Sequence, residues 1–181
     1  DTIVVLSGSV PPNLPLSAYE KLCLTIAEKP GVRLIVDADG VHLRAALAAR
    51  PVFIKPNVSE LAGVLGYEPS DLPQIVEGAR RMIELGAQNV AVSMGGDGAV
   101  FVSASRALLV TPPKVQVLGP VGAGDVMVAA ISQALEDKND FEALARYAAA
   151  AGTASVTVEG TRMASRRVVL QVFENTQTTE L

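Results

Sequence analysis

The stretch TIVVLSGSVPPNLPLSAYEKLCLTIAEKPGVRLIV, residues 2–36, contains the pattern that decides the fold. It opens and closes with short apolar runs, Ile3–Leu6 and Arg33–Val36, and encloses Leu16–Ala27, whose apolar residues recur at helical spacing. A strand, a helix and a second strand in this order are typical of a parallel sheet covered by helices. We therefore expect the run Ile3–Leu6 to be buried on both of its faces.

The same alternation continues along the chain. Further strands are predicted at Val52–Ile54, Val90–Ser93, Ala99–Val102 and Ala107–Val110. Further helices are predicted at Val58–Leu65, Ile75–Leu85, Val126–Leu135, Phe141–Ala151 and Ser165–Glu174. The turn Gly95–Gly98 predicts a hairpin. Together these elements predict an α/β fold in which a central, mostly parallel sheet is flanked by helices, in one domain.

Composition narrows the class of protein. The chain has 181 residues, 49% of them hydrophobic, and a formal charge of −4, which excludes a disordered chain. No cluster of Lys and Arg or platform of aromatic residues occurs, so no nucleic-acid partner is expected. Cys23 lies in a helical pattern, and we expect a buried thiol there. Because no apolar run is long enough to span a bilayer, we expect no membrane partner and a cytoplasmic location.

The glycine-rich stretch Gly119–Asp125 carries the strongest chemical signal. It leads directly into the predicted helix from Val126, and the first amides of a helix have no partner inside it. Those amides and the helix dipole favour an anion such as phosphate. Asp125, beside that site, can accept a proton from a hydroxyl nucleophile during phosphoryl transfer. The alternative is that Asp125 is only an N-cap.

Two common nucleotide motifs do not occur in the sequence. It has neither a P-loop nor the strand–GxGxxG–helix fingerprint of dinucleotide-binding proteins. A nicotinamide-dependent enzyme is therefore disfavoured.

The second candidate constellation is Lys55–Glu60, which follows a predicted strand. Ligands of open α/β sheets bind at the carboxyl ends of the strands. Asn57 and Glu60 are one helical turn apart and can face a hydrated Mg²⁺–phosphate complex together. The alternative is a capping box formed by the same two residues.

Two further turns and one histidine remain. Ser93–Gly98 can admit a nucleotide against its backbone, although a plain hairpin would also need these glycines. The hydroxyls of Ser7–Pro12 can hold a phosphate or a sugar, and a polar turn is an equal alternative. His42, the only histidine, is expected to be a solvated residue at a helix start.

Taken in order, these turns resemble the signatures of the PfkB (ribokinase-like) carbohydrate kinases, nearest to the phosphofructokinase branch. The matching segments are Ser7–Pro12, Lys55–Glu60, Ser93–Gly98 and Gly122–Asp125, and the tails Ala149–Ser155 and Glu159–Arg162 are also similar to that branch. The resemblance covers essentially the whole chain.

The resemblance implies ATP-dependent phosphorylation of a sugar-phosphate hydroxyl. Fructose 6-phosphate is the first candidate substrate, with 1-phosphofructokinase and tagatose-6-phosphate kinase as the nearest alternatives. Asp125 would be the base, and the amides of Gly122, Ala123 and Gly124 would form the anion hole. Ser9 would help to hold the phosphate of the substrate.

It also implies where the cofactors would bind. Asn57 and Glu60 would organise Mg²⁺ and the phosphates of ATP. The residues expected to line the nucleotide are Ser93, Gly95, Gly98 and Val121. A monovalent cation such as K⁺ would lie near Val121 and the segment 155–162.

The sequence departs from the family pattern in two respects. Family members have an N-terminal part that carries a sugar-binding acid and a β-sheet lid, through which the full-length form is expected to be a homodimer. Residues 1–181 lack that part and resemble the C-terminal nucleotide-binding and catalytic portion. Gly119-Pro120 and Val126 replace hydroxyl-bearing or small residues around the loop, which favours the rival interpretation of an inactive nucleotide-binding fragment.

Overall fold

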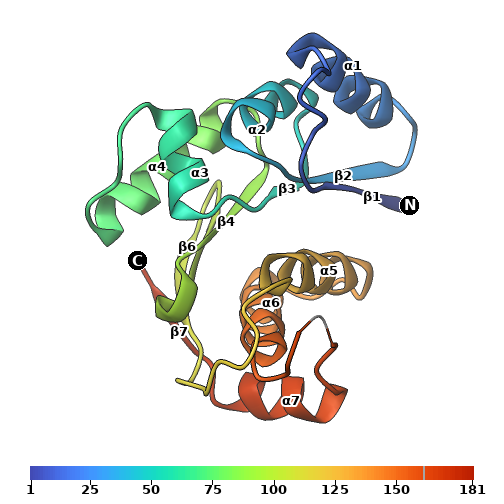
Figure 1. The fold of residues 1–181 in the computed structure, drawn as a ribbon. Coiled ribbons are helices and arrows are strands. Elements are labelled where there is room, and N and C mark those ends of the chain that lie inside the picture. Colours follow the sequence, from blue (N-terminus) through green and yellow to red (C-terminus); the bar gives the residue numbers. More distant parts are fainter. Residues whose placement is uncertain (161) are drawn as a thin grey trace. The chain divides into compact units, whose positions relative to one another are not determined.

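The computed structural model describes residues 1–160 and 162–181, which divide into two compact units (Figure 1). Unit 1 consists of Asp1–Ser93 with Val100–Ala107, and unit 2 consists of Met94–Ala99 with Leu108–Leu181. Hydrogen bonding links seven strands in the order in which they occur along the chain, β1 to β7. The predicted α/β fold with a mostly parallel sheet and helices is confirmed.

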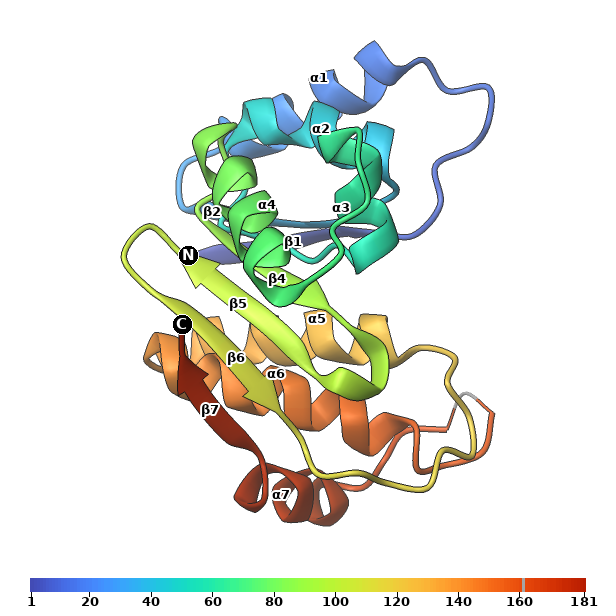
Figure 2. The same ribbon diagram turned by 90° about the vertical axis from the view of Figure 1, so that its left-hand side faces the viewer.

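Unit 1 alternates strands with helices. Its elements are β1 (Thr2–Ser7), α1 (Leu16–Ala27), β2 (Val32–Asp37), α2 (Gly40–Ala46), β3 (Phe53–Ile54), α3 (Val58–Leu65), α4 (Leu72–Glu84), β4 (Asn89–Ser93) and most of β5 (Ala99–Ser103). The pairs β1–β2, β2–β3 and β3–β4 are parallel. Helices α1 to α4 lie together on one face of these strands, as both views show (Figures 1 and 2). Parallel strands therefore bring their carboxyl ends to one edge of the sheet.

The apolar runs form the core of unit 1. Leu34, Ile35 and Val36 of β2 are buried, as are both residues of β3. Cys23 on α1 is fully buried, as predicted, and burial raises the pKa of its thiol.

Strand β1 differs from its prediction. None of its residues is fully buried, and Val5 is 39% exposed, although the run was expected to be covered on both faces. The physical reason is its position: β1 is the first strand in the order, so that only β2 pairs with it among the described strands.

Unit 2 is mainly helical. It contains most of β6 (Ala107–Thr111), then α5 (Ala123–Glu136), α6 (Phe141–Ser155), α7 (Arg166–Glu174) and β7 (Gln177–Glu180). Helix α6 packs against both α5 and α7. Its alanines let these helices approach closely, and Ala150 and Ala154 form a small core with Val172 of α7. Strand β7 pairs antiparallel with β6.

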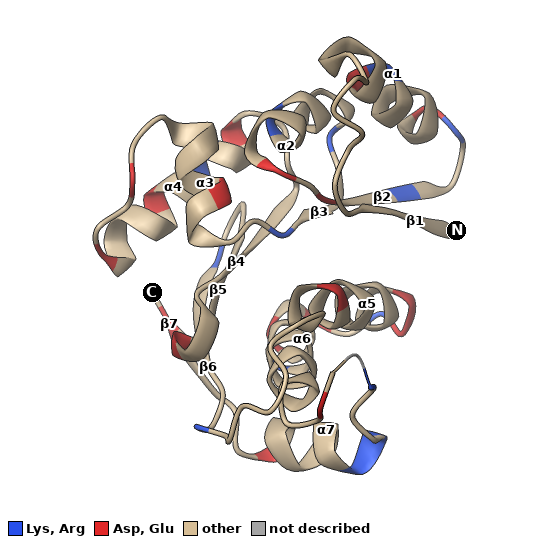
Figure 3. Cartoon of the chain, in the orientation of Figure 1, with Lys and Arg blue, Asp and Glu red and all other residues tan. Residues whose placement is uncertain are grey.

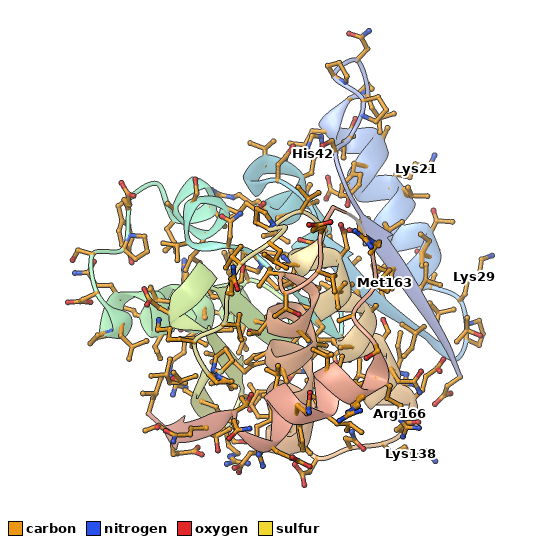
Figure 4. All side chains as sticks on the ribbon, turned by 60° about the horizontal axis from the view of Figure 1, so that its bottom comes forward. Lys21, Lys29, His42, Lys138, Met163 and Arg166 are labelled. Carbon is orange, nitrogen blue, oxygen red and sulfur yellow. The ribbon has the colours of Figure 1, made fainter. Side chains whose placement is uncertain are left out.

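Charged side chains are spread along both units. Figure 3 shows Lys and Arg on helices and loops that also carry Asp and Glu, and Figure 4 shows Lys21 and Lys29 projecting from α1 and the loop that follows it. Within residues 1–160 and 162–181, no helix is long and apolar enough to cross a membrane.

Candidate active site

The glycine-rich loop ends at a helix start that no side chain within the described residues caps. Gly122 is the N-cap of α5 and has a φ of 84°, in the left-handed region that favours glycine. Ala123 and Gly124 occupy the first two helical positions and Asp125 the third. Asp125 is therefore not the N-cap, which removes the simplest alternative for this carboxylate. The first-turn amides have no partners within the helix, and this arrangement suits an anion.

The helix start is held against α6. A Cβ added at Gly152 would lie 3.3 Å from the carbonyl oxygen of Ala123 and 3.6 Å from Cβ of Met127. A larger residue at Gly152 would push the beginning of α5 away. The tail Ala149–Ser155 therefore helps to set the position of the turn at the start of α5.

Gly119, one of the departures from the family pattern, is packed closely as well. The amides of Leu118 and Gly119 donate to the carbonyl oxygen of Val156, at 2.8 and 3.2 Å. A Cβ at Gly119 would come within 2.8 Å of the carbonyl oxygen of Val158 and 3.0 Å of the amide nitrogen of Gly160. Glycine thus permits a close approach between the loop and the segment after α6.

That segment was also predicted to help hold a monovalent cation together with Val121. Val121 is 67% exposed and precedes the N-cap Gly122. Of the range 155–162, Thr161 lies outside the described residues. The close approach at Gly119 brings backbone carbonyl groups to the loop, and carbonyl oxygens are suitable ligands for such a cation.

The turn Gly95–Gly98 is tightly closed. It is a 3₁₀ turn over Gly95–Asp97, and the amide of Met94 donates to the carbonyl oxygen of Gly98 at 2.9 Å. Gly98 has a φ of 95°, and a Cβ there would collide with the carbonyl group of Val110. Gly95 has open space around its Cα, so the turn leaves its tip accessible to a ligand.

In unit 1, the predicted metal and nucleotide residues lie next to one another. Asn57 and Ser93 form an isolated parallel bridge, and the amide of Ser93 donates to the carbonyl oxygen of Pro56 at 3.0 Å. The structure therefore brings Asn57 and Glu60, which follow β3, next to Ser93, the last residue of β4.

Asn57 and Glu60 also form the capping box that was the alternative to a metal site. The amide of Glu60 donates to Oδ1 of Asn57, and the amide of Asn57 donates to Oε2 of Glu60, both at 2.8 Å. The cap uses one carboxylate oxygen of Glu60 and leaves Oε1 outside it. An amide oxygen and a carboxylate oxygen are ligands that fit hydrated Mg²⁺, so capping and metal binding are compatible.

Sequence reasoning assigned no role to a buried ion pair beside this site. Nζ of Lys55 lies 3.2 Å from Oδ1 of Asp37, and both side chains are largely buried. Lys55 follows β3 and Asp37 ends β2, so the pair joins two neighbouring strand ends. The one indication of this pair in the sequence is that a lysine directly follows an apolar strand. The amide of Gly8 donates to the carbonyl oxygen of Asp37 at 3.1 Å, which places the exposed loop of Ser9 beside the same strand end.

His42 is not the solvated residue that was predicted. Its Nδ1 lies 2.6 Å from Oδ1 of Asp39, its side chain is only 14% exposed, and its ring packs edge-on against Tyr19 (His42 is labelled in Figure 4). The hydrogen bond from His42 lowers the pKa of Asp39, and burial raises the pKa of Tyr19 to about 12. Asp39 caps α2, so the cluster stabilises a helix start.

Comparison with known proteins identifies the family of this chain. The model of the pfkB family carbohydrate kinases matches residues 1–167, and the chain belongs to this family. It is 37% identical over 173 residues to ATP-dependent 6-phosphofructokinase isozyme 2 of Escherichia coli, covering 94% of this chain and 56% of that protein. It is 42% identical over 147 residues to a 1-phosphofructokinase of Rhodobacter capsulatus, covering 81% of this chain and 46% of that protein.

A solved structure gives the same result for the fold. The crystal structure of phosphofructokinase-2 from Escherichia coli in complex with potassium matches with a TM-score of 0.89 and 35% identity, covering 95% of this chain and 56% of that one. The chain thus spans about half the length of the curated relatives it matches.

Proposed function

We propose that this chain supplies the nucleotide-binding and catalytic portion of an ATP-dependent kinase that phosphorylates a hydroxyl of a sugar phosphate. The observation that carries the proposal is the uncapped start of α5, where Gly122 turns the chain and Asp125 lies in the first helical turn. Such a turn binds an anion and holds a carboxylate beside it. Fructose 6-phosphate is the first candidate substrate, and fructose 1-phosphate and tagatose 6-phosphate are the alternatives.

The residues divide the work of phosphoryl transfer. Asp125 accepts the proton of the sugar hydroxyl, whose oxygen then forms a bond to the terminal phosphorus of ATP while the bond to ADP breaks. The first-turn amides after Gly122 stabilise the charge of the transferring group. Asn57 and Glu60 would hold Mg²⁺, which neutralises phosphate charge when bound.

The remaining roles concern binding. Ser93, Gly95, Gly98 and Val121 would line the nucleotide, and Ser9 would contact the phosphate of the sugar. A monovalent cation beside Val121 would stabilise the loop before α5. A cytoplasmic location and a homodimer built through a lid outside residues 1–181 belong to the same proposal.

A second candidate is a chain that binds nucleotide and transfers nothing. Residues 1–181 match about half of each relative, and this candidate requires that the sugar site depend on residues outside that range. The two candidates differ in turnover and agree in nucleotide binding.

The deciding experiment measures ADP release in a coupled assay with ATP, Mg²⁺ and each of the three sugar phosphates. The variant Asp125→Asn should lower turnover by about 10²–10⁴-fold, which is the usual contribution of a general base. Asp137→Asn, at the other end of the same helix, is the matched control and should keep full turnover.

Calorimetry with an ATP analogue completes the test. Binding without turnover on any sugar phosphate would support the second candidate. Turnover that survives Asp125→Asn would refute the assignment of the base, and a chain that neither binds nor turns over nucleotide would refute both candidates.

A further inference from the structure

Lys114 makes a contact that neither the family resemblance nor the proposed reaction uses. It follows the Pro112-Pro113 pair behind β6, and its Nζ donates to the carbonyl oxygen of Gly96 at 2.7 Å. The same Nζ lies 3.5 Å from Oδ1 of Asp97. Both residues belong to unit 2, so the contact joins two segments of one compact unit.

The carbonyl contact is the more significant of the two. The side chains of Lys114 and Asp97 are 77% and 85% exposed, and an exposed ion pair of this kind contributes little. The carbonyl bond, in contrast, is a second anchor for the peptide between Gly96 and Asp97, whose amide already donates to the carbonyl oxygen of Met94 at 3.2 Å. It therefore acts on the backbone of the turn.

Few contacts hold the tip of the turn apart from its own backbone hydrogen bonds and Lys114. A Cβ built at Gly95 or at Gly96 would meet no atom within 4 Å, so the space into which a side chain would project is open at both residues. Three backbone hydrogen bonds close the turn: the amide of Met94 donates to the carbonyl oxygen of Gly98, the amide of Asp97 to that of Met94, and the amide of Gly98 to that of Gly95. Glycines have large conformational freedom, and a ligand that needs one arrangement of them must bear the entropic cost of ordering them.

We propose that Lys114 is a positioning residue that pre-orders the Gly95–Gly98 turn for the nucleotide. The inference rests on the proposed function, in which Gly95 and Gly98 line the nucleotide. Lys114 acts through the Gly96 carbonyl group and touches no reacting atom. Removing it takes away one anchor of the Gly96–Asp97 peptide, so the turn is less ordered before nucleotide binds and nucleotide binding must complete the ordering.

The test compares four variants of this chain. Lys114→Met removes the ammonium group and keeps a long apolar stem, and Lys114→Arg restores a donor. Asp97→Asn removes only the ion pair. Lys138→Met, at an exposed lysine elsewhere in unit 2 that is labelled in Figure 4, is the matched control.

Binding of a fluorescent ATP analogue is measured first. Lys114→Met should raise Kd by about 3- to 10-fold, as expected for the loss of one hydrogen bond. Lys114→Arg should restore most of the affinity, while Asp97→Asn and Lys138→Met should change Kd by less than about 2-fold. Where turnover is measurable, Lys114→Met should raise KM for ATP and leave kcat and KM for the sugar phosphate unchanged.

Amide hydrogen exchange without nucleotide separates pre-ordering from direct contact with the ligand. Among the four variants, only Lys114→Met should show faster exchange at residues 95–98, and its Tm should equal that of the parent chain. Faster exchange together with weaker nucleotide binding would support the proposal. Unchanged exchange, or unchanged Kd in a chain that binds nucleotide, would overturn it.

If the proposed function is wrong, the binding measurement and the exchange measurement give different information. If the parent chain binds no ATP analogue, the assignment of the nucleotide site is wrong, and the role of Lys114 in positioning it is overturned as well. Exchange at residues 95–98 would then still report whether Lys114 orders the turn.

Discussion

Adding a single methyl group at Gly119 tests whether the loop before α5 depends on close backbone packing. In Gly119→Ala, the new Cβ would lie 2.8 Å from the carbonyl oxygen of Val158, with the amide nitrogen and carbonyl oxygen of Gly160 at 3.0 and 3.1 Å. All three are backbone atoms, so the loop or the segment after α6 must shift. Overpacking of this kind costs about 1–3 kcal/mol. For a chain of this size, that corresponds to a fall in Tm of roughly 2–12 °C.

Urea unfolding followed by circular dichroism measures the effect. Gly96→Ala is the matched control, because residue 96 has nothing within 4 Å of an added Cβ and its φ is outside the left-handed region. Both changes reduce the freedom of the unfolded chain by the same amount, so their difference isolates the steric cost. The control should stay within about 0.5 kcal/mol of the parent. If Gly119→Ala is as stable as Gly96→Ala, the argument from close approach is refuted.

Three other changes test unit 1. Lys55→Met should lower the free energy of unfolding by about 3 kcal/mol, since it leaves Asp37 as a buried charge without its ammonium partner. Adding Asp37→Asn should recover part of that loss. A double variant that loses as much stability as Lys55→Met alone would contradict the assignment of the loss to this ion pair. Asn57→Ala should cost about 1 kcal/mol in a thermal melt through loss of the α3 cap, and no change would show that the cap is unimportant. The pKa of Asp39 is lowered in the folded chain, so its stabilising contribution is complete above the unfolded pKa near 3.8 and is lost as the pH falls through the folded value. The stability gap between the parent and Asp39→Asn should accordingly be constant at neutral pH and narrow in acid, and a gap that widens in acid would contradict the cause assigned to the shift.

Elements with local signals could be predicted well from the sequence. The bounds of α1 agree with the prediction at both ends, as do those of α3. In α3, Asn57 and Glu60 provide the start signal and Gly66, with a φ of 81°, provides the stop. These signals come from residues close together in the sequence, so the helix could be predicted without knowledge of the rest of the fold.

A short helix and a strand that depends on a distant partner were missed. Helix α2 has only seven residues, which is too short for a clear apolar period. Strand β7 has the polar sequence QTTE and forms by pairing with β6, far away along the chain. Sequence pattern does not record such pairing.

In the candidate site, too, features formed by residues adjacent in sequence were predicted and features formed by distant residues were not. The glycine-rich loop and its helix were predicted, because glycines and a following apolar helix are adjacent in sequence. The pair formed by Lys55 and Asp37 was not, since Asp37 ends β2 and Lys55 follows β3, and the two meet only when these strands are in register. The partner of His42 was missed although Asp39 is three residues away, because the spacing alone does not say that the ring is buried.

The outer position of β1 has a practical consequence for anyone who prepares this chain. An edge strand offers unpaired backbone groups, and here the apolar residues beside them, such as the 39% exposed Val5, lack full cover. Edges of this kind are templates for pairing with other chains, and natural proteins protect them with charges. Residues 1–181 prepared on their own should therefore associate as their concentration rises, and Val5→Lys should suppress that association.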